Sequence, residues 1–250
     1  MNPRRLLRKL SRRLAVRRLL PSGPPPAWWQ EVIRCQDIIA ASEPHPYYLQ
    51  AYRREEIWCW IHIAKWLWED GRERRPRRCL DIGCAYGTLS LYCRRLFSCQ
   101  VSCTDCTDRY LSSALVRQQG LTFAQSNIEL DTPLWGADFD VVLFTEVLEH
   151  LNFHPVPTLR KIAGLLAEGG RLYLSTPDAA EWGRLTKYYA SVGDIPQPEA
   201  GLARVDDHVY HYGRAELADV VAAAGLRVER WSYSPGASGR HHNLALVKAL

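Results

Sequence analysis

Two glutamates and a histidine stand close together in the segment FDVVLFTEVLEHL, residues 139–151. Glu146, Glu149 and His150 have the spacing i, i+3 and i+4, which places their side chains on one face of a helical turn. Carboxylates and imidazoles are common general bases, so this group suits the deprotonation of a hydroxyl. Two carboxylates and an imidazole also suit a hard divalent cation. The residues alone leave both kinds of chemistry open.

A second candidate site is the turn DIGCAYG at residues 81–87. Gly83 and Gly87 permit a tight turn and a close approach of a ligand to the backbone. Asp105 ends the next expected strand, where a carboxylate can accept both hydroxyls of a ribose. These features predict an adenosine-type cofactor. Ala85 stands at the middle glycine of a dinucleotide fingerprint, so the turn alone does not separate a nicotinamide cofactor from S-adenosylmethionine.

From residue 76 onward, short β-rich runs alternate with helical patterns. The expected strands are residues 79–83, 99–105, 121–127, 139–145, 170–177, 226–234 and 243–250. The expected helices are residues 88–96, 109–119, 156–168 and 214–225. This alternation predicts an α/β, Rossmann-like doubly wound fold with a mostly parallel, seven-stranded sheet. Ligands of such sheets bind outside the carboxyl ends of the strands, near the switch in strand order.

Four blocks in order resemble the class I S-adenosylmethionine-dependent methyltransferases. They are LDIGCAYG (80–87), Asp105, FDVVLFTEVLEHL (139–151) and LLAEGGRLYLSTP (165–177). The closest pattern is that of the small-molecule group with an EVLEHL-like block, and the resemblance covers residues 76–250. It implies that the cofactor lies with its methionine part along Asp81, Gly83 and Gly87 and with its ribose at Asp105. It further implies that Asn127 and Ile128 lie beside the adenine and that Thr145 and Glu146 face the sulfonium. The group more often has Asp at position 127.

The E-x-x-E-H spacing also resembles the metal site of two methyltransferase types, one acting on catechols in ubiquinone synthesis and one on the 3′-terminal ribose of small RNAs. In the RNA type a D-H motif supplies a further histidine, and here Asp207-His208 lies 58 residues beyond His150. This resemblance implies a divalent cation that binds an adjacent diol and lowers the pKa of the hydroxyl, held by Glu146, Glu149, His150 and His208. Metal-free members carry similar blocks, and in that case His150 or His208 is the general base.

Methyl transfer from a sulfonium is an in-line displacement on an activated donor, so the protein must mainly align the acceptor and deprotonate it. We therefore predict O-methylation of a hydroxylated small molecule, such as a sugar, a glycan precursor or a phenolic metabolite, with Glu146, His150 and His208 as catalytic residues. Two alternatives remain open. One is metal-dependent 2′-O-methylation of an RNA 3′ end. The other is a nicotinamide-dependent oxidoreductase or a non-catalytic Rossmann-like binding protein.

The chain divides into three parts by composition. Residues 27–75 are helical in pattern, hold six of the nine tryptophans and predict a helical cap. The apolar residues of 57–68 run around the whole helix, which indicates burial on most sides. Residues 76–250 form the expected methyltransferase domain, and 178–212 are an aromatic insertion that would shape the acceptor pocket.

Residues 1–26 are a basic, leucine-containing segment followed by a Pro-rich linker. Residues 1–20 carry eight bases and no acid, whereas the other 230 residues have a net charge of −3. The segment predicts either a basic amphipathic helix on an anionic membrane surface or a solvated tail. The mildly acidic remainder makes a nucleic-acid partner unexpected, and the expected partner is a small-molecule acceptor.

The chain has eight cysteines and no apolar stretch long enough to span a membrane. The basic N-terminus has no continuous apolar core behind it, unlike a secretory signal. The cysteines are therefore expected to be reduced, and the expected location is the cytoplasm, with contact to a membrane surface through the basic segment.

Overall fold

The computed structural model describes residues 24–249 apart from residues 43, 186, 200, 202–204 and 237. The expected basic amphipathic helix and most of the Pro-rich linker lie outside the described residues. Within the described part, no helix has the length and apolar character needed to cross a bilayer.

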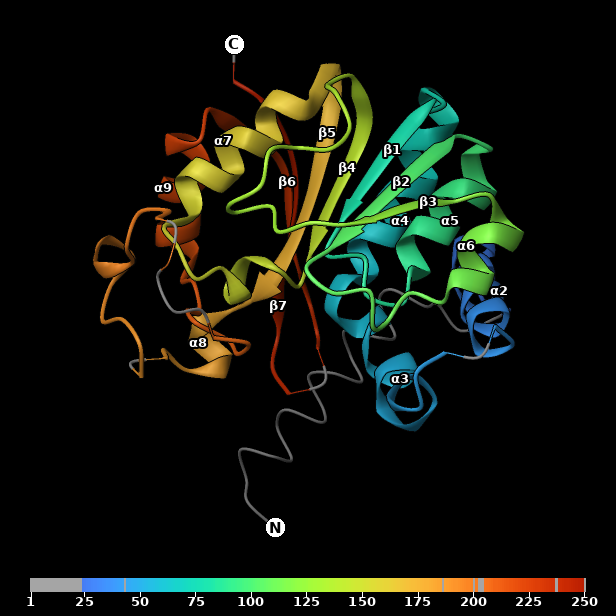
Figure 1. Cartoon of the computed structure of the whole chain (residues 1–250), viewed down its shortest axis with the longest axis horizontal. Helices are drawn as coiled ribbons and strands as arrows, with labels where there is room; N and C mark the ends of the chain where they lie inside the picture. The colour runs from blue at the N-terminus through green and yellow to red at the C-terminus, as the bar shows by residue number, and fades with distance from the viewer. Residues whose placement is uncertain are drawn as a thin grey trace.

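A seven-stranded sheet in the order β3-β2-β1-β4-β5-β7-β6 forms the centre of the molecule (Figure 1). Strands β1 to β5 pair in parallel, and β7 runs antiparallel between β5 and β6. The bounds are β1 (Arg78–Ile82), β2 (Gln100–Asp105), β3 (Thr122–Gln125), β4 (Phe139–Thr145), β5 (Leu166–Pro177), β6 (Leu226–Ser234) and β7 (His241–Lys248). The predicted Rossmann-like, mostly parallel sheet is confirmed. The strand order reverses between β1 and β4.

Helices cover both faces of the sheet, with α2, α4 and α5 on one side and α7 and α9 on the other (Figure 1). The helices are α2 (Ala27–Ala40), α3 (Arg53–Glu55), α4 (Ile57–Glu73), α5 (Thr88–Phe97), α6 (Ser113–Gln119), α7 (Pro155–Leu165), α8 (Ala179–Trp182) and α9 (Arg214–Ala223). Three shorter turns are η1 (Tyr48–Tyr52), η2 (Leu148–His150) and η3 (Val192–Asp194).

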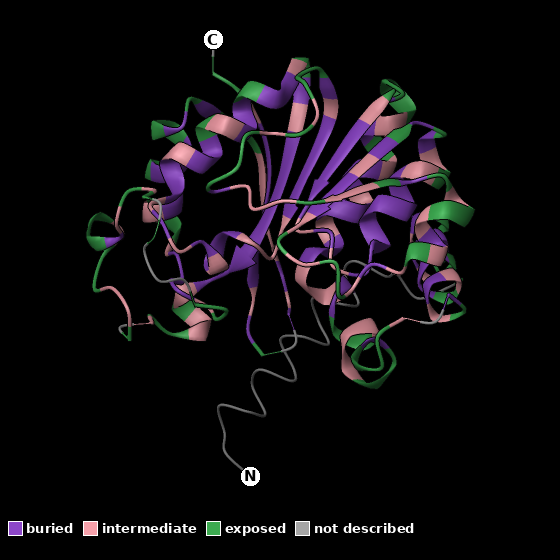
Figure 2. Ribbon diagram, in the orientation of Figure 1, coloured by how far each residue is buried: buried purple, intermediate pink, exposed green. Residues whose placement is uncertain are grey.

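The strands separate two hydrophobic cores because alternate residues point to opposite faces. On β1, Cys79 joins the core beneath α2, α4 and α5, whereas Leu80 and Ile82 join the core beneath α7 and α9. Buried positions fill most of the central strands β1, β4, β5 and β7, whereas the edge strands β3 and β6 are mostly half-buried or exposed (Figure 2).

The segment predicted as a helical cap contributes a layer to one of these cores. Helix α4 packs against β5, β6 and β7, and α2 packs against α5. The buried carboxylate of Glu56 accepts hydrogen bonds from Gln36 (2.8 Å), Thr88 (3.0 Å) and Tyr48 (3.4 Å). Burial raises the pKa of Glu56 to about 7. Since Thr88 begins α5, this carboxylate ties the N-terminal segment to the helix that follows the glycine turn.

Candidate active site

The turn after β1 has the backbone geometry that its glycines predict. Gly83 (φ +74°) and Gly87 (φ +81°) both adopt left-handed conformations. A Cβ on Gly83 would lie 2.2 Å from Val147 Cγ2, and one on Gly87 would lie 2.7 Å from Leu111 Cδ1. Gly83 is therefore favoured both by its dihedral angle and by the branched Val147 beside it, whereas Gly87 is favoured mainly by its dihedral angle, since the end of the Leu111 side chain can move. Ala85 also has a positive φ, +45°, so alanine keeps the turn at the place of the fingerprint glycine.

Asp105 at the end of β2 is fixed against this turn. Its Oδ2 accepts the N–H of Ala85 (3.0 Å), and its Oδ1 accepts the N–H of Thr107 (3.2 Å). Burial raises the pKa of Asp105, while these hydrogen bonds oppose the rise. The thiol and N–H of Cys106 also act on this carboxylate. The half-buried Asp105 carboxylate is thus held in place at the carboxyl end of the sheet.

Asp81 lies beneath the turn, with 3% of the residue exposed. It accepts a hydrogen bond from Ser90 on α5. Burial raises its pKa to about 7, although the Ser90 hydroxyl acts in the opposite direction. The side chain connects the end of β1 to the first turns of α5, whose N-terminus faces the same region.

Asn127 and Ile128 follow β3 beside Asp105, because the N–H of Ser126 donates to the Asp105 carbonyl (2.9 Å). The Asn127 side-chain oxygen accepts the N–H of Glu129 (2.9 Å). The Asn127 N–H donates to Asp131 (2.7 Å). A turn of this kind suits Asn as well as Asp, and Ile128 is half-buried.

The prediction that Glu146, Glu149 and His150 share one helical face is wrong. The Glu146 N–H donates to the Ser175 carbonyl (2.9 Å), which continues the pairing of β4 with β5 one residue beyond Thr145. Glu146 then turns with φ +56°, and only residues 148–150 form the turn η2. The strand pairing thus separates Glu146 from the two residues that follow in η2.

Glu146 belongs to a first side-chain group. Its Oε1 accepts the Ser175 hydroxyl (2.7 Å). Its Oε2 lies 2.7 Å from Nδ1 of His241, an ion-pair distance without the angle of a hydrogen bond. Burial alone would raise the pKa of Glu146, but His241 and Ser175 outweigh it and lower the pKa below its ordinary value. Glu146 is therefore a carboxylate at neutral pH. One ligand atom each from Cys59, Glu146 and His241 lie within 4.8 Å of one another.

Glu149, His150 and His208 form a second group. Glu149 is 1% exposed and accepts the hydroxyl of Thr176 (2.9 Å). Burial, together with the charge of Glu146, raises the pKa of Glu149 well above its ordinary value. The His150 and His208 rings meet edge to face with centroids 4.6 Å apart. Glu149, His150 and His208 each offer one atom that could bind a metal ion, and these three atoms lie within 4.8 Å of one another. The Asp207-His208 motif thus lies against His150 in η2.

The hydrogen-bond partners of these histidines assign their tautomers. Nδ1 of His211 lies 2.9 Å from the Gly183 carbonyl, which can only accept, so Nδ1 carries the hydrogen. Nε2 of neutral His211 then accepts from Nδ1 of His208 (2.8 Å). Nδ1 of His150 donates to the Asp207 carbonyl (2.9 Å) in the same way. In their neutral forms, His150 and His208 therefore both keep a free lone pair on Nε2.

The pKa of His208 falls to about 4 because of burial, with further lowering by His150 and His211. His208 is therefore neutral at physiological pH, and its Nε2 is an acceptor or a ligand.

The sequence did not single out three further residues of the site: Cys59 on α4, Thr176 on β5 and His241 at the start of β7. Trp182, at the end of α8, belongs to the aromatic insertion that was expected to shape the acceptor pocket. The ring of Trp182 lies 5.3 Å from His241 and 5.9 Å from His208, measured between centroids, so it borders both groups. A signal was present in the sequence, since His241 and His242 directly precede the expected strand 243–250.

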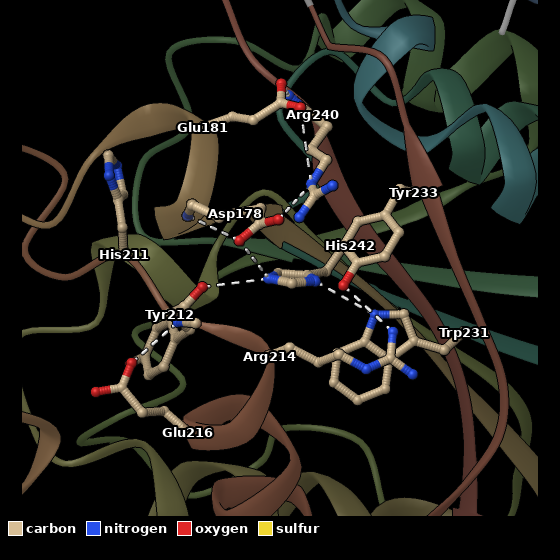
Figure 3. A network of polar contacts seen from close by, with 12 residues as sticks. Asp178, Glu181, His211, Tyr212, Arg214, Glu216, Trp231, Tyr233, Arg240 and His242 are labelled. Carbon is tan, nitrogen blue, oxygen red and sulfur yellow. Dashed lines mark hydrogen bonds and ion pairs between the residues drawn. The ribbon is translucent and has the colours of Figure 1, made fainter.

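A polar network holds the segments around His241 in place (Figure 3). The buried Asp178 carboxylate accepts from Arg240 (2.5 Å) and lies 3.4 Å from Nε2 of His242. The Asp178 N–H also donates to the Arg240 carbonyl (3.1 Å). Both neighbours of His241 in the chain are thus tied to the first residue of the insertion, which orients His241 toward Glu146.

Comparisons with known proteins bear on the family and the fold of the chain. A family model described as a methyltransferase domain matches residues 50–230. Two ubiquinone biosynthesis O-methyltransferases, from Xanthomonas euvesicatoria pv. vesicatoria (strain 85-10) and Parvibaculum lavamentivorans, are each 34% identical to the chain, over 108 and 113 residues. The matches cover 40% and 43% of this chain and 42% and 44% of the relatives. The chain thus spans less than half the length of these relatives.

Solved structures share the fold at low identity. A Burkholderia thailandensis 1,6-didemethyltoxoflavin-N1-methyltransferase has a TM-score of 0.58 at 17% identity, covering 92% of this chain and 93% of that one. A Synechocystis magnesium protoporphyrin IX methyltransferase with bound S-adenosylmethionine has a TM-score of 0.53 at 16% identity, covering 100% and 98%. At such identities the likeness concerns the fold alone.

Proposed function

This chain belongs to the methyltransferase domain family and is an S-adenosylmethionine-dependent class I enzyme, and we propose that it methylates a hydroxyl oxygen of a small molecule. The partial similarity to ubiquinone biosynthesis O-methyltransferases supports oxygen as the acceptor atom. A sugar, a glycan precursor or a phenolic metabolite would each supply such a hydroxyl.

The cofactor would lie across the switch point between β1 and β4. In this proposal, Gly83 and Gly87 let the methionine part approach the backbone above Asp81. Asp105 accepts the ribose hydroxyls at the end of β2, where the N–H groups of Ala85 and Thr107 fix its carboxylate. The segment 127–128 borders the adenine, as supported by the contact of Ser126 with Asp105.

At the other end of the cofactor, the sulfonium faces Thr145 and Glu146 at the end of β4. The lowered pKa of Glu146 keeps its carboxylate charged, and a carboxylate attracts the sulfonium cation. Methyl transfer then breaks the carbon–sulfur bond and forms the carbon–oxygen bond in line.

The observation that carries the acceptor chemistry is the pair of free Nε2 lone pairs on His150 and His208. Full proton transfer from a phenol of pKa about 10 to His208 at about 4 would cost about 8 kcal/mol. We therefore assign His208 to accept a hydrogen bond and orient the hydroxyl. His150 takes the proton, since its Nδ1–H already donates to the Asp207 carbonyl, which stabilises the imidazolium that forms.

A calorimetric titration with S-adenosylmethionine, S-adenosylhomocysteine and NAD tests the proposal. We expect micromolar binding of the two sulfur ligands and none of NAD, followed by methylation of hydroxylated acceptors. Preferential binding of NAD would favour an oxidoreductase instead, and binding of none of the three would favour a non-catalytic Rossmann-like protein. Binding without turnover of hydroxylated compounds would contradict oxygen as the acceptor atom.

The second group also supports another candidate, metal-assisted methylation of a diol. Glu149, His150 and His208 offer a carboxylate and two imidazoles within 4.8 Å of one another, and the resemblance adds Glu146, which instead contacts His241. Three of the four residues thus fit a divalent ion, which would lower the pKa of a bound hydroxyl when present. Chelation should then abolish turnover of catechols or of RNA 3′ ends, and RNA binding should weaken steeply with salt.

We propose that residues 1–20 bring the enzyme to an anionic membrane surface. Their eight bases support this, since each Lys or Arg near such a surface contributes about 1 kcal/mol. The full chain should sediment with phosphatidylglycerol vesicles at low salt and not with phosphatidylcholine vesicles. Replacing the bases with glutamine should abolish sedimentation while leaving S-adenosylhomocysteine binding intact. Equal sedimentation of both proteins would contradict the proposal.

A further inference from the structure

We infer that Cys59, Glu146 and His241 form a binding site for a borderline-soft divalent cation, with Zn²⁺ as the best match. This inference goes beyond the proposed methyl transfer and concerns the first side-chain group, which is separate from Glu149, His150 and His208. It shares Glu146 with that proposal, so the ion and the cofactor sulfonium would compete for one carboxylate. The three ligands come from helix α4, from the residue after β4 and from the first residue of β7.

The distances suit a tetrahedral ion. One ligand atom from each of Cys59, Glu146 and His241 lies within 4.8 Å of the other two. Ligands at about 2.0–2.3 Å from zinc lie roughly 3.3–3.7 Å from one another in a tetrahedron. Small side-chain movements of about an ångström therefore bring the three atoms into position. Three protein ligands leave a fourth position for a water or another oxygen or sulfur ligand.

The ring of His241 provides independent support. The residue is 2% exposed, and neither ring nitrogen makes a hydrogen bond within the part of the chain that the structure describes. A buried polar group left unsatisfied costs about 1–3 kcal/mol. A cation bound to one nitrogen of His241 would remove this cost for that nitrogen. Nδ1 already lies 2.7 Å from the Glu146 carboxylate, so the ring faces a second ligand.

The charge around the site also favours a cation. The Glu146 carboxylate brings negative charge to the site, 2.7 Å from Nδ1 of His241. A divalent ion would balance this negative charge and stabilise the Cys59 thiolate.

The set of ligand types selects the ion. Thiolate, imidazole and carboxylate together match zinc, whereas magnesium and calcium prefer oxygen ligands. The second group contains no sulfur, so a metal–thiolate signal distinguishes the two groups. The contacts of Asp178 with Arg240 and His242 hold the backbone on both sides of His241, as an ordered ligand requires (Figure 3).

The test is a titration of the metal-free full chain with Co²⁺, a spectroscopic substitute for Zn²⁺, followed by Zn²⁺ competition. We expect one equivalent to bind with a thiolate-to-cobalt charge-transfer band, which Zn²⁺ abolishes. Cys59→Ser should abolish the band, and Cys59→Ser and His241→Gln should each weaken Zn²⁺ binding by at least about 100-fold. Cys106→Ser, at an exposed cysteine, should retain the band.

His208→Gln is the control for the second group and should leave the cobalt band unchanged. A band that persists in Cys59→Ser, or that is lost only in His208→Gln, would overturn the inference. S-adenosylhomocysteine binding by each variant reports whether it is folded, and His241→Gln keeps the test decisive if Cys59→Ser does not fold. Failure of the wild type to bind S-adenosylhomocysteine would contradict the methyltransferase assignment, but not the metal site.

Discussion

The two ends of the candidate site are built in different ways. At the cofactor end, backbone groups carry most contacts, as in the donation from Ala85 N–H to Asp105 and from Gly83 N–H to the Thr104 carbonyl. At the acceptor end, side chains from distant segments meet, as Glu149 does with Thr176 and His208 with His211. Backbone geometry restricts which residues are tolerated, whereas a side-chain cluster can change one member at a time. We therefore expect substitutions at the acceptor end to change the rate of methyl transfer and substitutions at the cofactor end to change cofactor affinity, each with little effect on the other.

His150→Gln should give the largest effect and should be confined to the acceptor end. Removing a general base lowers the rate by about 100- to 10,000-fold, while the affinity for S-adenosylhomocysteine should stay within about twofold. Steady-state kinetics and calorimetry measure the two quantities. A parallel loss of cofactor affinity would show that the two ends are coupled.

Gly83→Ala should disable the cofactor end. The new Cβ would lie 2.2 Å from Val147 at a φ of +74°, so both the turn and its neighbour must shift. We expect S-adenosylhomocysteine affinity to fall at least about 100-fold, together with a loss of stability of about 1–3 kcal/mol. Gly164→Ala in α7 is the matched control, since nothing lies within 4 Å of its Cβ and alanine favours a helix. Unchanged affinity in Gly83→Ala would refute the backbone-approach interpretation of the turn.

Asp105→Asn should have an intermediate effect at the same end. The amide replaces one acceptor oxygen with a donor, which disturbs the bond from Ala85 or Thr107 and one hydroxyl contact. A loss of about 1.5–3 kcal/mol corresponds to roughly 10- to 100-fold weaker S-adenosylhomocysteine binding. Asp108→Asn, on the exposed loop nearby, should bind normally. Equal binding by both variants would exclude Asp105 as the ribose ligand.

Stability against pH tests the link between the N-terminal segment and the cofactor end. Glu56 has a pKa of about 7 in the folded protein and 4.5 ordinarily, so the folded state binds more protons between these values. The free energy of unfolding should therefore fall as pH rises from about 4.5 to 7 and become level above 7. The contribution of one group is at most about 3 kcal/mol.

Chemical denaturation of wild type and Glu56→Gln at pH 5.5 and 8 measures this effect. Glutamine still accepts from Thr88 and Tyr48 but does not titrate, so the difference between the two pH values should shrink in the variant. Asp81, whose pKa also rises to about 7, should account for much of the remainder. An unchanged pH dependence in Glu56→Gln would show that Glu56 is ionised in the folded state.

Much of the fold was predictable from the sequence because its signals are local. The structure has the predicted alternation of strands and helices and the predicted glycine turn. The expected strand 226–234 has the same bounds as β6. Asp105 could be identified from the sequence because the pattern of β2 shows where that strand ends, and Asp105 is its last residue. The shared helical face of Glu146 and His150 was not predictable, since the pairing of β4 with β5 extends to Glu146.

By itself the sequence determined the sheet, the turn and the identity of the residues at the carboxyl ends of the strands, because each depends on near neighbours. Only the tertiary structure decided which side chains meet. It placed Cys59 and His241, 182 residues apart, around Glu146, and it placed His208 beside His150, a pair that only the family resemblance had grouped. Such meetings depend on packing between distant segments, for which periodicity and spacing carry no signal.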